Sequence, residues 1–159
     1  MVPTQRDSRL CLLLLLGILG MVISYHATPA GLTRTQWFEI QHIKNMTHRR
    51  CNNEMLRVNN YTKRCKNINT FLHTTFAFVA SVCNTPNVTC PTTRYMNCHN
   101  SSVQVDITDC NLTSAPQPYK NCNYRQTSAR KYFIVACNNS QPGDNATYSV
   151  VPVHLDWIS

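Results

Sequence analysis

The hydrophobic pattern of the chain changes at Cys83. Before this cysteine, apolar residues recur at three- and four-residue spacing, which is typical of helices that bury one face. This spacing predicts three helices, at about residues 33–43, 49–59 and 75–82. Thr33 and Gln36 stand at the spacing of a capping box, so the first helix is expected to begin there.

After Cys83 the chain consists of short alternating runs separated by turn residues. Strict alternation of apolar and polar residues indicates half-buried strands. Strands are expected at residues 103–108, in part of 119–124, at 130–137 and at 148–155, with a turn at 139–144. The predicted class is therefore α+β, with three helices, largely early in the chain, packed on an antiparallel sheet. The chain has no internal repeat and no linker long enough to divide it, so residues 28–159 are expected to form a single domain.

The N-terminal segment predicts a secretory signal peptide. An almost unbroken apolar run occupies residues 10–23 and follows two arginines. The run is short for a membrane span, and small residues follow it at Ser24 and Ala27, as at a cleavage site. We expect the signal peptide to be residues 1–27, although cleavage after Ser24 is also possible and a retained membrane anchor is the alternative. The mature protein is then secreted, and the sequence leaves open whether secretory granules store it.

The cysteines indicate disulfides rather than a metal site. Nine cysteines occur, and one of them lies within the expected signal peptide, which leaves eight. An even number in a small secreted chain is typical of a disulfide framework. Successive cysteines lie seven to eighteen positions apart with no C-x2-C pair, which does not suit zinc. We therefore expect four disulfides, whose pairing the sequence alone leaves open, and neither a metal nor a cofactor.

Seven N-x-S/T sequons are present, and each is a possible glycosylation site if it lies on the surface of a secreted protein. They begin at Asn45, Asn60, Asn87, Asn100, Asn111, Asn138 and Asn145.

The formal net charge of +8 at pH 7 points to a polyanionic partner, either nucleic acid, a heparin-like glycan or an anionic membrane. A basic run with a single acid, Glu54, comprises Arg49, Arg50, Arg57, Lys63, Arg64 and Lys66. This run suits either a track for an RNA backbone or a membrane, or a merely solvated face.

Three residues in different parts of the chain suggest a shared chemistry. His42 ends the first predicted helix, and Lys66 follows Cys65, which would fix its backbone if this cysteine is in a disulfide. His154 and Asp156 lie two apart in the last predicted strand, so they share a face, and the carboxylate can orient the imidazole. Such a set fits metal-free cleavage of RNA by its own 2′-hydroxyl, with His42 as base, His154 as acid and Lys66 stabilising the phosphoryl charge.

Each of these residues alone would more commonly be an ordinary surface or half-buried residue, so the argument depends on their combination. The other histidines considered have no comparable neighbours in the sequence, and no role is expected for them: His48, His73 and His99.

Residues 65–71 read C-K-N-I-N-T-F and match the C-K-x-x-N-T-F signature of the pancreatic-type ribonucleases, the ribonuclease A superfamily. Gln41-His42 is similar to the end of that family's first helix, and residues 152–156 resemble its C-terminal strand. The eight cysteines also follow the family's order, and the resemblance covers essentially residues 34–158. The chain looks most like the eosinophil-type branch, that of eosinophil-derived neurotoxin and eosinophil cationic protein.

The resemblance implies a kidney-shaped fold with its helices on a bent antiparallel sheet and a cleft between two lobes. It also implies the disulfides Cys51–Cys110, Cys65–Cys122, Cys83–Cys137 and Cys90–Cys98. It assigns the base to His42, the acid to His154 and charge stabilisation to Lys66. The implied substrate contacts are Gln41 at the phosphate, Asn69 within the signature, Thr70 at the pyrimidine 5′ to the cut, Asn97 at the base on the 3′ side, and Leu155 with Asp156 in the last strand.

Thr70 can read either pyrimidine, because its hydroxyl can accept from uracil or donate to cytosine. Asn97 offers an amide that can pair bidentately with adenine. The implied partners are single-stranded RNA and the cytosolic ribonuclease inhibitor that binds relatives, and the chain is expected to be a monomer.

Several positions depart from the pancreatic pattern. Trp37 and Ile40 replace two basic residues of the first helix, so an outlying phosphate is expected to bind weakly. Leu155 replaces a phenylalanine, which removes an aromatic platform worth ~1–3 kcal/mol by stacking. The loop between Cys90 and Cys98 is one residue longer, and Asn138 stands where an acid is common. Catalysis is expected to survive with lower efficiency on small substrates.

Two functions of different classes remain open at this point. The first is a secreted endoribonuclease that cuts RNA after pyrimidines through a 2′,3′-cyclic phosphate, with a role in host defence. The second is a cationic antimicrobial protein that disrupts membranes without catalysis. A signalling role is possible within the family but has no positive indication in this sequence.

Overall fold

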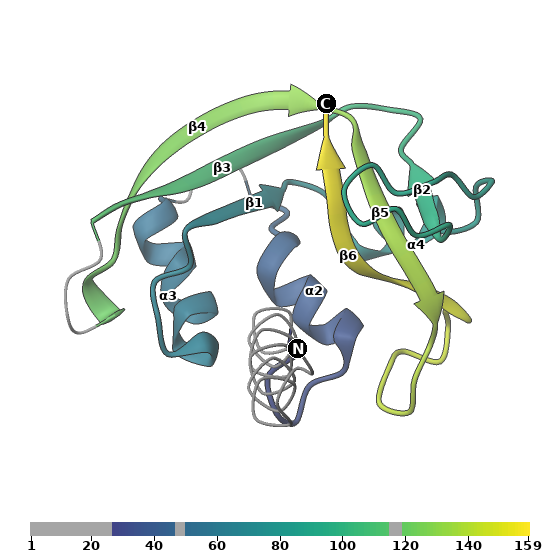
Figure 1. Ribbon diagram of the computed structural model, residues 1–159, viewed down its shortest axis with the longest axis horizontal. Coiled ribbons are helices and arrows are strands. Elements are labelled where there is room, and N and C mark those ends of the chain that lie inside the picture. Colours follow the sequence, from purple (N-terminus) through teal and green to yellow (C-terminus); the bar gives the residue numbers. More distant parts are fainter. Residues whose placement is uncertain (1–26, 47–49, 115–118) are drawn as a thin grey trace, which may run out of the picture.

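The computed structural model describes residues 27–46, 50–114 and 119–159 (Figure 1). The expected signal peptide, apart from Ala27, lies outside these residues. The helices are α2 (Arg34–His42), α3 (Cys51–Thr62) and α4 (Phe76–Val82), with a 3₁₀ turn η1 (Tyr119–Asn121). The strands are β1 (Ile68–Leu72), β2 (Cys98–Asn100), β3 (Val105–Ser114), β4 (Asn123–Lys131), β5 (Phe133–Asn139) and β6 (Val150–Ile158). No helix of the described residues is long and apolar enough to cross a membrane.

The three predicted helices are present, with caps that explain where they begin. At α2 the Thr33 hydroxyl accepts from the Gln36 amide at 3.1 Å, and the Gln36 side chain accepts from the Thr33 amide at 2.8 Å, so the predicted capping box is confirmed. At α4 the Thr75 hydroxyl accepts from the backbone of Phe78. Each cap satisfies amides that the first turn of a helix leaves without an intrahelical partner.

Helix α3 runs a turn further than the sequence pattern indicated. The prediction ended it at residue 59, whereas the helix continues to Thr62. It ends at Lys63, whose φ of 58° is left-handed while its amide still bonds to the Asn59 carbonyl at 2.8 Å. The helix begins at Cys51, after an extended Arg50, rather than at residue 49.

The strands form two antiparallel three-stranded sheets, in the orders β1-β3-β4 and β2-β5-β6. The α+β class is confirmed, and the sheet expected as one is divided into two. Figure 1 shows the sheets as two arms, with α3 beside the first, α4 beside the second and α2 between them. Strands β1 and β2 were not identified as strands from the sequence, because they are short and lack clean alternation.

The division between the sheets corrects the prediction of one strand at 130–137. Strand β4 ends at Lys131 in the first sheet and β5 begins at Phe133 in the second. Tyr132, between them, exchanges two backbone hydrogen bonds with the C-terminal Ser159, at 2.8 and 3.0 Å. The β-forming run at 130–137 is therefore divided, because its first residues pair with β3 in one sheet and residues 133–137 pair with β6 in the other.

Other strand boundaries also move. The strand predicted at 103–108 is β3 and starts two residues later, and the alternation seen in 119–124 belongs partly to the 3₁₀ turn η1. The last strand covers Val150–Ile158 instead of 148–155, so it begins two residues later than predicted and continues three residues further.

Helix α2 contributes to the core of both arms. Phe38 is buried with Leu72, Val79 and Phe133 in one hydrophobic cluster. Trp37 and Ile40 belong instead to a second cluster, with residues of α3 and the first sheet. Helix α2 contacts both β1 and β6. Because two sides of this short helix are packed into separate clusters, the position of its C-terminal residue His42 is fixed.

Four disulfides occur among the described residues. They join Cys51 to Cys110, Cys65 to Cys122, Cys83 to Cys137 and Cys90 to Cys98. This is the pairing that the resemblance implies. Each bond of this kind typically adds ~2–4 kcal/mol to the stability of a small domain.

Candidate active site

His42 is the last residue of α2, and its ring is fixed from two sides. Its ring centroid lies 5.2 Å from that of Phe38, one turn earlier. Its Nδ1 donates to the Thr70 carbonyl at 2.8 Å, so in the neutral ring Nε2 is the basic nitrogen. The pKa of His42 is lowered to about 3, first by burial, which disfavours the charged ring, and next by the positive charge of Lys66. His42 is therefore neutral at physiological pH.

Lys66 reaches the same place from the segment before β1. Its ammonium donates to Gln41 Oε1 and to Asn69 Oδ1, both at 2.8 Å. The Asn69 amide in turn donates to the Gln41 carbonyl at 2.8 Å, which holds the two acceptors in place. Burial, together with the charge of Arg64, lowers the pKa of Lys66 to about 8. Lys66 is therefore mostly charged at neutral pH and loses its proton in mildly alkaline solution.

The backbone of Lys66 is anchored independently of its side chain. The Asn59 side chain accepts from the Lys66 amide at 3.0 Å, and the Tyr124 hydroxyl donates to the Lys66 carbonyl at 2.6 Å. The preceding Cys65 is bonded to Cys122. Burial raises the pKa of Tyr124, so its hydroxyl remains a donor at any pH at which the lysine is charged.

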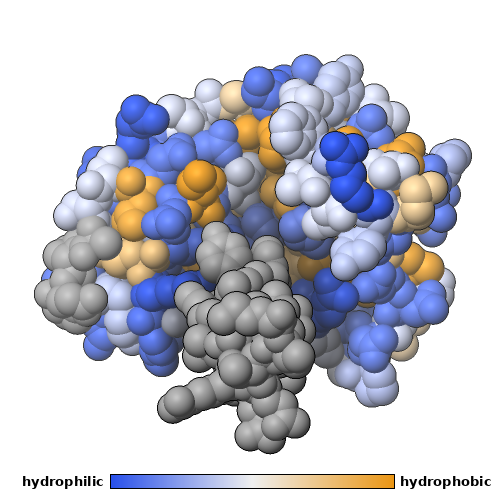
Figure 2. Space-filling model, viewed as in Figure 1, coloured by the Kyte–Doolittle hydropathy of each residue, from blue (hydrophilic) through white to orange (hydrophobic). Residues whose placement is uncertain are grey.

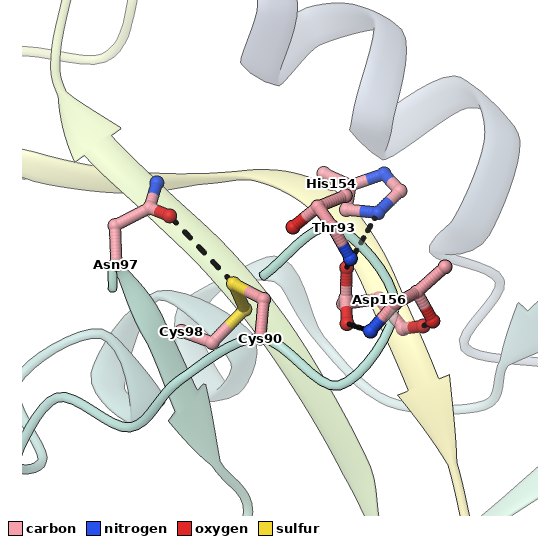
Figure 3. A network of polar contacts seen from close by, with 7 residues as sticks. Cys90, Thr93, Asn97, Cys98, His154 and Asp156 are labelled. Carbon is pink, nitrogen blue, oxygen red and sulfur yellow. Dashed lines mark hydrogen bonds and ion pairs between the residues drawn. A yellow bond between two sulfur atoms is a disulfide. The ribbon is translucent and has the colours of Figure 1, made fainter. Parts of the chain in front are cut away.

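His154 comes from β6, on the other sheet. Its Nε2 lies 3.1 Å from Asp156 Oδ1, the same-face contact expected from a spacing of two residues (Figure 3). In the pairing of β6 with β5, His154 lies opposite Ala136 and Leu155 lies opposite Val135. The register shifts on both sides of this pair, so one residue of β6 is left unpaired before His154 and another after Leu155. Such bulges re-aim side chains along a strand.

Asp156 is itself held by the disulfide loop between Cys90 and Cys98. Its carboxylate is buried and accepts from the backbone amides of Thr92, at 2.8 Å, and Thr93, at 3.3 Å. The Thr92 hydroxyl donates to the Asp156 carbonyl at 2.9 Å. Figure 3 shows this loop wrapped around the carboxylate, which fixes the direction from which Asp156 meets His154.

The three residues expected to act together do come together. The Lys66 ammonium bonds to Gln41, which precedes His42 at the end of α2, and α2 contacts β6, the strand that carries His154. The charges of Lys66 and His154 both lower the pKa of His42. They arrive from separate elements: His42 from α2, Lys66 from the segment before β1, and His154 from β6. Two imidazoles, one of them neutral, and an ammonium can serve as base, acid and charge stabiliser at one site.

Thr70 lies beside this group on β1, and its hydroxyl already has an acceptor. Oγ1 donates to Asp109 Oδ1 at 2.5 Å, and Asp109 stands directly opposite Thr70 in the pairing of β1 with β3. The sequence analysis did not identify Asp109, because only the register of two distant strands brings it to Thr70.

Two further predicted substrate contacts, Asn97 and Leu155, lie on the second sheet or beside it. The Asn97 amide nitrogen donates to the Cys137 carbonyl at 3.2 Å, which holds this side chain against β5. Figure 3 places Asn97 on the far side of the Cys90–Cys98 disulfide from His154. Leu155 is half-buried against the hydrophobic cluster that contains Phe38 and Phe133 and presents only part of its side chain.

Two other histidines are used structurally. His73 lies between the Lys44 carbonyl, at 2.7 Å, and the Thr108 hydroxyl, at 2.6 Å. His99 is buried and bonds to the Thr85 carbonyl at 2.7 Å. His48 lies outside the described residues.

One group of potential metal ligands occurs among the residues described, namely Cys90, Cys98 and Asp156. The two sulfur atoms are bonded to each other and so provide no thiolate, and the carboxylate is engaged by backbone amides. The group therefore does not fit a metal ion.

The basic run lies mainly on and after α3. Arg50, Arg57, Lys63 and Arg64 are exposed, and Arg49 is outside the described residues. The single acid, Glu54, is buried and lies 3.1 Å from the Lys44 ammonium, so its charge offsets that lysine. In the face shown in Figure 2, hydrophilic residues predominate, with separate hydrophobic patches between them.

The sequons differ in their surroundings. Asn111 and Asn138 are half-buried within strands β3 and β5. The other asparagines are exposed: Asn45, Asn60, Asn87, Asn100 and Asn145.

The fold, the disulfides and the arrangement around His42 define the class of the protein. The family model for pancreatic ribonuclease matches residues 33–156, and the chain belongs to this family. Eosinophil cationic protein of Rattus norvegicus is a similar protein, 49% identical over 152 residues that cover 96% of both chains. The resemblance to the eosinophil-type branch is therefore confirmed, and RNA is the substrate class that membership of the family implies.

Proposed function

We propose that this protein is a secreted, monomeric endoribonuclease that cleaves single-stranded RNA on the 3′ side of pyrimidines. The observation that carries the proposal is the meeting of a neutral His42, a charged Lys66 and the Asp156-oriented His154. The reaction needs no metal, because two imidazoles perform both proton transfers.

The chemistry follows from the geometry of the two rings. With Nδ1 of His42 bonded to the Thr70 carbonyl, Nε2 removes the proton of the 2′-hydroxyl. The 2′-oxygen attacks phosphorus, and the bond from phosphorus to the 5′-oxygen breaks. With Nε2 of His154 engaged by Asp156, the proton on Nδ1 passes to the departing 5′-oxygen. The products are a 2′,3′-cyclic phosphate and a 5′-hydroxyl.

Lys66 stabilises the negative charge that accumulates on the phosphoryl oxygens during the attack. Gln41 and Asn69 hold its ammonium in place, and Gln41 also contacts the phosphate. Thr70 reads the pyrimidine, Leu155 packs beside it, and Asn97 contacts the base on the 3′ side. The cytosolic ribonuclease inhibitor and heparin-like glycans are proposed partners on the strength of the family and of the positive charge.

A second candidate function is membrane disruption in host defence, independent of catalysis. The observation in its favour is the charge of +8 together with the exposed Arg57, Lys63 and Arg64. Anionic membranes attract such surfaces electrostatically.

One variant distinguishes the two functions. His154→Ala is expected to abolish RNA cleavage, since each acid–base role contributes ~10²–10⁴ in rate. Bacterial killing that persists in this variant supports the membrane function, whereas parallel loss of killing ties it to catalysis. Undiminished RNA cleavage by the variant would overturn the proposed enzyme.

A further inference from the structure

The loop between β5 and β6, residues 140–149, contains a sequon that the ribonuclease chemistry does not use. Asn145 is exposed, and its Oδ1 accepts from the Thr147 amide at 3.0 Å, which closes a turn within the sequon. Its Nδ2, the atom to which a glycan is attached, makes no hydrogen bond within the described residues. Among the sequons whose three residues are all described, this is the only one closed by such a bond.

The loop has a fixed position on the first turn of α2. Asp144 accepts from the Thr33 hydroxyl at 2.5 Å and from the Gln141 amide at 2.6 Å. The side-chain Nε2 of Gln36 donates to the Gly143 carbonyl at 3.1 Å. Asn145 follows directly, so its place relative to α2 is determined by these bonds rather than by a free loop.

Asn145 lines a pocket of about 550 Å³ between this loop, α2 and the start of α4. The volume lies within the range of ~300–1,000 Å³ usual for small-molecule sites. Its apolar wall is formed by Phe76 and Tyr148, both half-buried, with ring centroids 5.6 Å apart and planes at 74°. Its polar wall includes Gln36 and the exposed carboxylate of Glu39, for which no side-chain bond occurs among the described residues.

This combination suits a pyranose ring. The C–H face and the N-acetyl methyl of a sugar pack on aromatic rings, and its hydroxyls donate to carboxylate and amide oxygens. A sugar attached to Asn145 is already at the pocket, so it binds at a high effective concentration and without the loss of translational freedom that a free ligand incurs.

We infer that Asn145 is N-glycosylated and that the first N-acetylglucosamine of its glycan occupies this pocket, packed on Phe76 and Tyr148. The glycan thereby fastens the β5–β6 loop to α2 and α4. None of the other six sequon asparagines lines the pocket. Exposed Asn87 therefore provides a matched control for loss of a sequon elsewhere.

The test uses the full chain secreted from mammalian cells, with glycan occupancy measured by peptide mass spectrometry. Thermal unfolding is compared for the wild type, Asn145→Gln, Phe76→Ala and the double variant, with Asn87→Gln as control. We expect Asn145 to be occupied and its loss to lower Tm by about 2–4 °C, a shift typical of one lost contact in a domain of this size. In the Phe76→Ala background the same loss should have little further effect, and RNA cleavage should be unchanged throughout. An unoccupied Asn145, or equal shifts in both backgrounds, overturns the inference.

A second measurement does not depend on the folding of Phe76→Ala. Peptide N-glycosidase is applied to the native wild-type protein, and release is followed at Asn145 and at another occupied exposed sequon. Release at Asn145 is expected to be at least tenfold slower in the native protein and comparable after denaturation. Equal rates in the native protein contradict a seated sugar.

Discussion

The contact between Thr70 and Asp109 predicts a preference between the two pyrimidines. Because the Thr70 hydroxyl donates to the carboxylate at 2.5 Å, its oxygen is left to accept, which suits the N3–H of uracil. Cytosine presents an acceptor at N3, so Thr70 must release Asp109 and donate to the base instead. Cleavage after uridine should therefore be favoured over cleavage after cytidine.

To bind cytosine, the Thr70 hydroxyl exchanges a charged acceptor, the Asp109 carboxylate, for a neutral one, N3 of the base. The free-energy difference between these two hydrogen bonds sets the size of the preference. A hydrogen bond to a charged group contributes ~1.5–3 kcal/mol and a neutral one ~1 kcal/mol, a difference of roughly 0.5–2 kcal/mol. This corresponds to a preference of about 2- to 30-fold in kcat/KM. Asp109→Ala frees the hydroxyl to donate or accept, so the ratio for UpA over CpA should fall towards one. Asp109→Asn retains a neutral acceptor and should give an intermediate ratio.

Asp106→Ala is the matched control. Asp106 lies on the same strand, but it is exposed and pairs with Arg130 at 3.1 Å, away from Thr70. Its loss should leave the ratio of UpA to CpA cleavage unchanged. The reasoning is refuted if a folded Asp109→Ala protein keeps the wild-type ratio, or if Asp106→Ala changes the ratio as much.

Three further predictions concern the groups around the site. In an NMR titration of the folded protein, the Lys66 ammonium should lose its proton at about pH 8, because burial and the charge of Arg64 lower its pKa. Arg64→Ala removes this neighbouring positive charge and should move the titration to higher pH; an unchanged midpoint would contradict the reasoning. Asp156→Asn should reduce kcat by about 10- to 100-fold with little change in KM, since His154 loses a charged partner worth ~1.5–3 kcal/mol; unchanged kcat in steady-state assays would contradict this. Tyr124→Phe should lower the free energy of unfolding by ~1–2 kcal/mol in urea titrations, because the Lys66 carbonyl loses its bond to the hydroxyl.

Local features of the fold could be predicted from the sequence. The capping box at Thr33 depends on residues three apart, and the contact between His154 and Asp156 depends on residues two apart. Both follow from the geometry of a single helix or strand. The family resemblance supplied what no local rule contains, above all the pairing of the eight cysteines.

Contacts across strands could not be predicted in the same way. Asp109 meets Thr70 because β1 and β3 pair in one particular register, and a shift of one residue would turn Asp109 to the other face of the sheet. Asp156 accepts a hydrogen bond from the Thr92 amide, which lies in a loop 64 positions earlier in the chain. The split at Tyr132 likewise depends on its pairing with the C-terminal residue, which local β-propensity does not report.

Analysis of cleavage products tests the central claim most directly. The refolded mature chain is incubated with a defined single-stranded RNA in the presence of a chelator, and the ends of the products are identified by mass spectrometry. If His42, Lys66 and His154 act together as proposed, cleavage proceeds after pyrimidines and leaves 2′,3′-cyclic phosphates and 5′-hydroxyls. Absence of cleavage, or cleavage that requires a metal ion and leaves 5′-phosphates, would contradict the account.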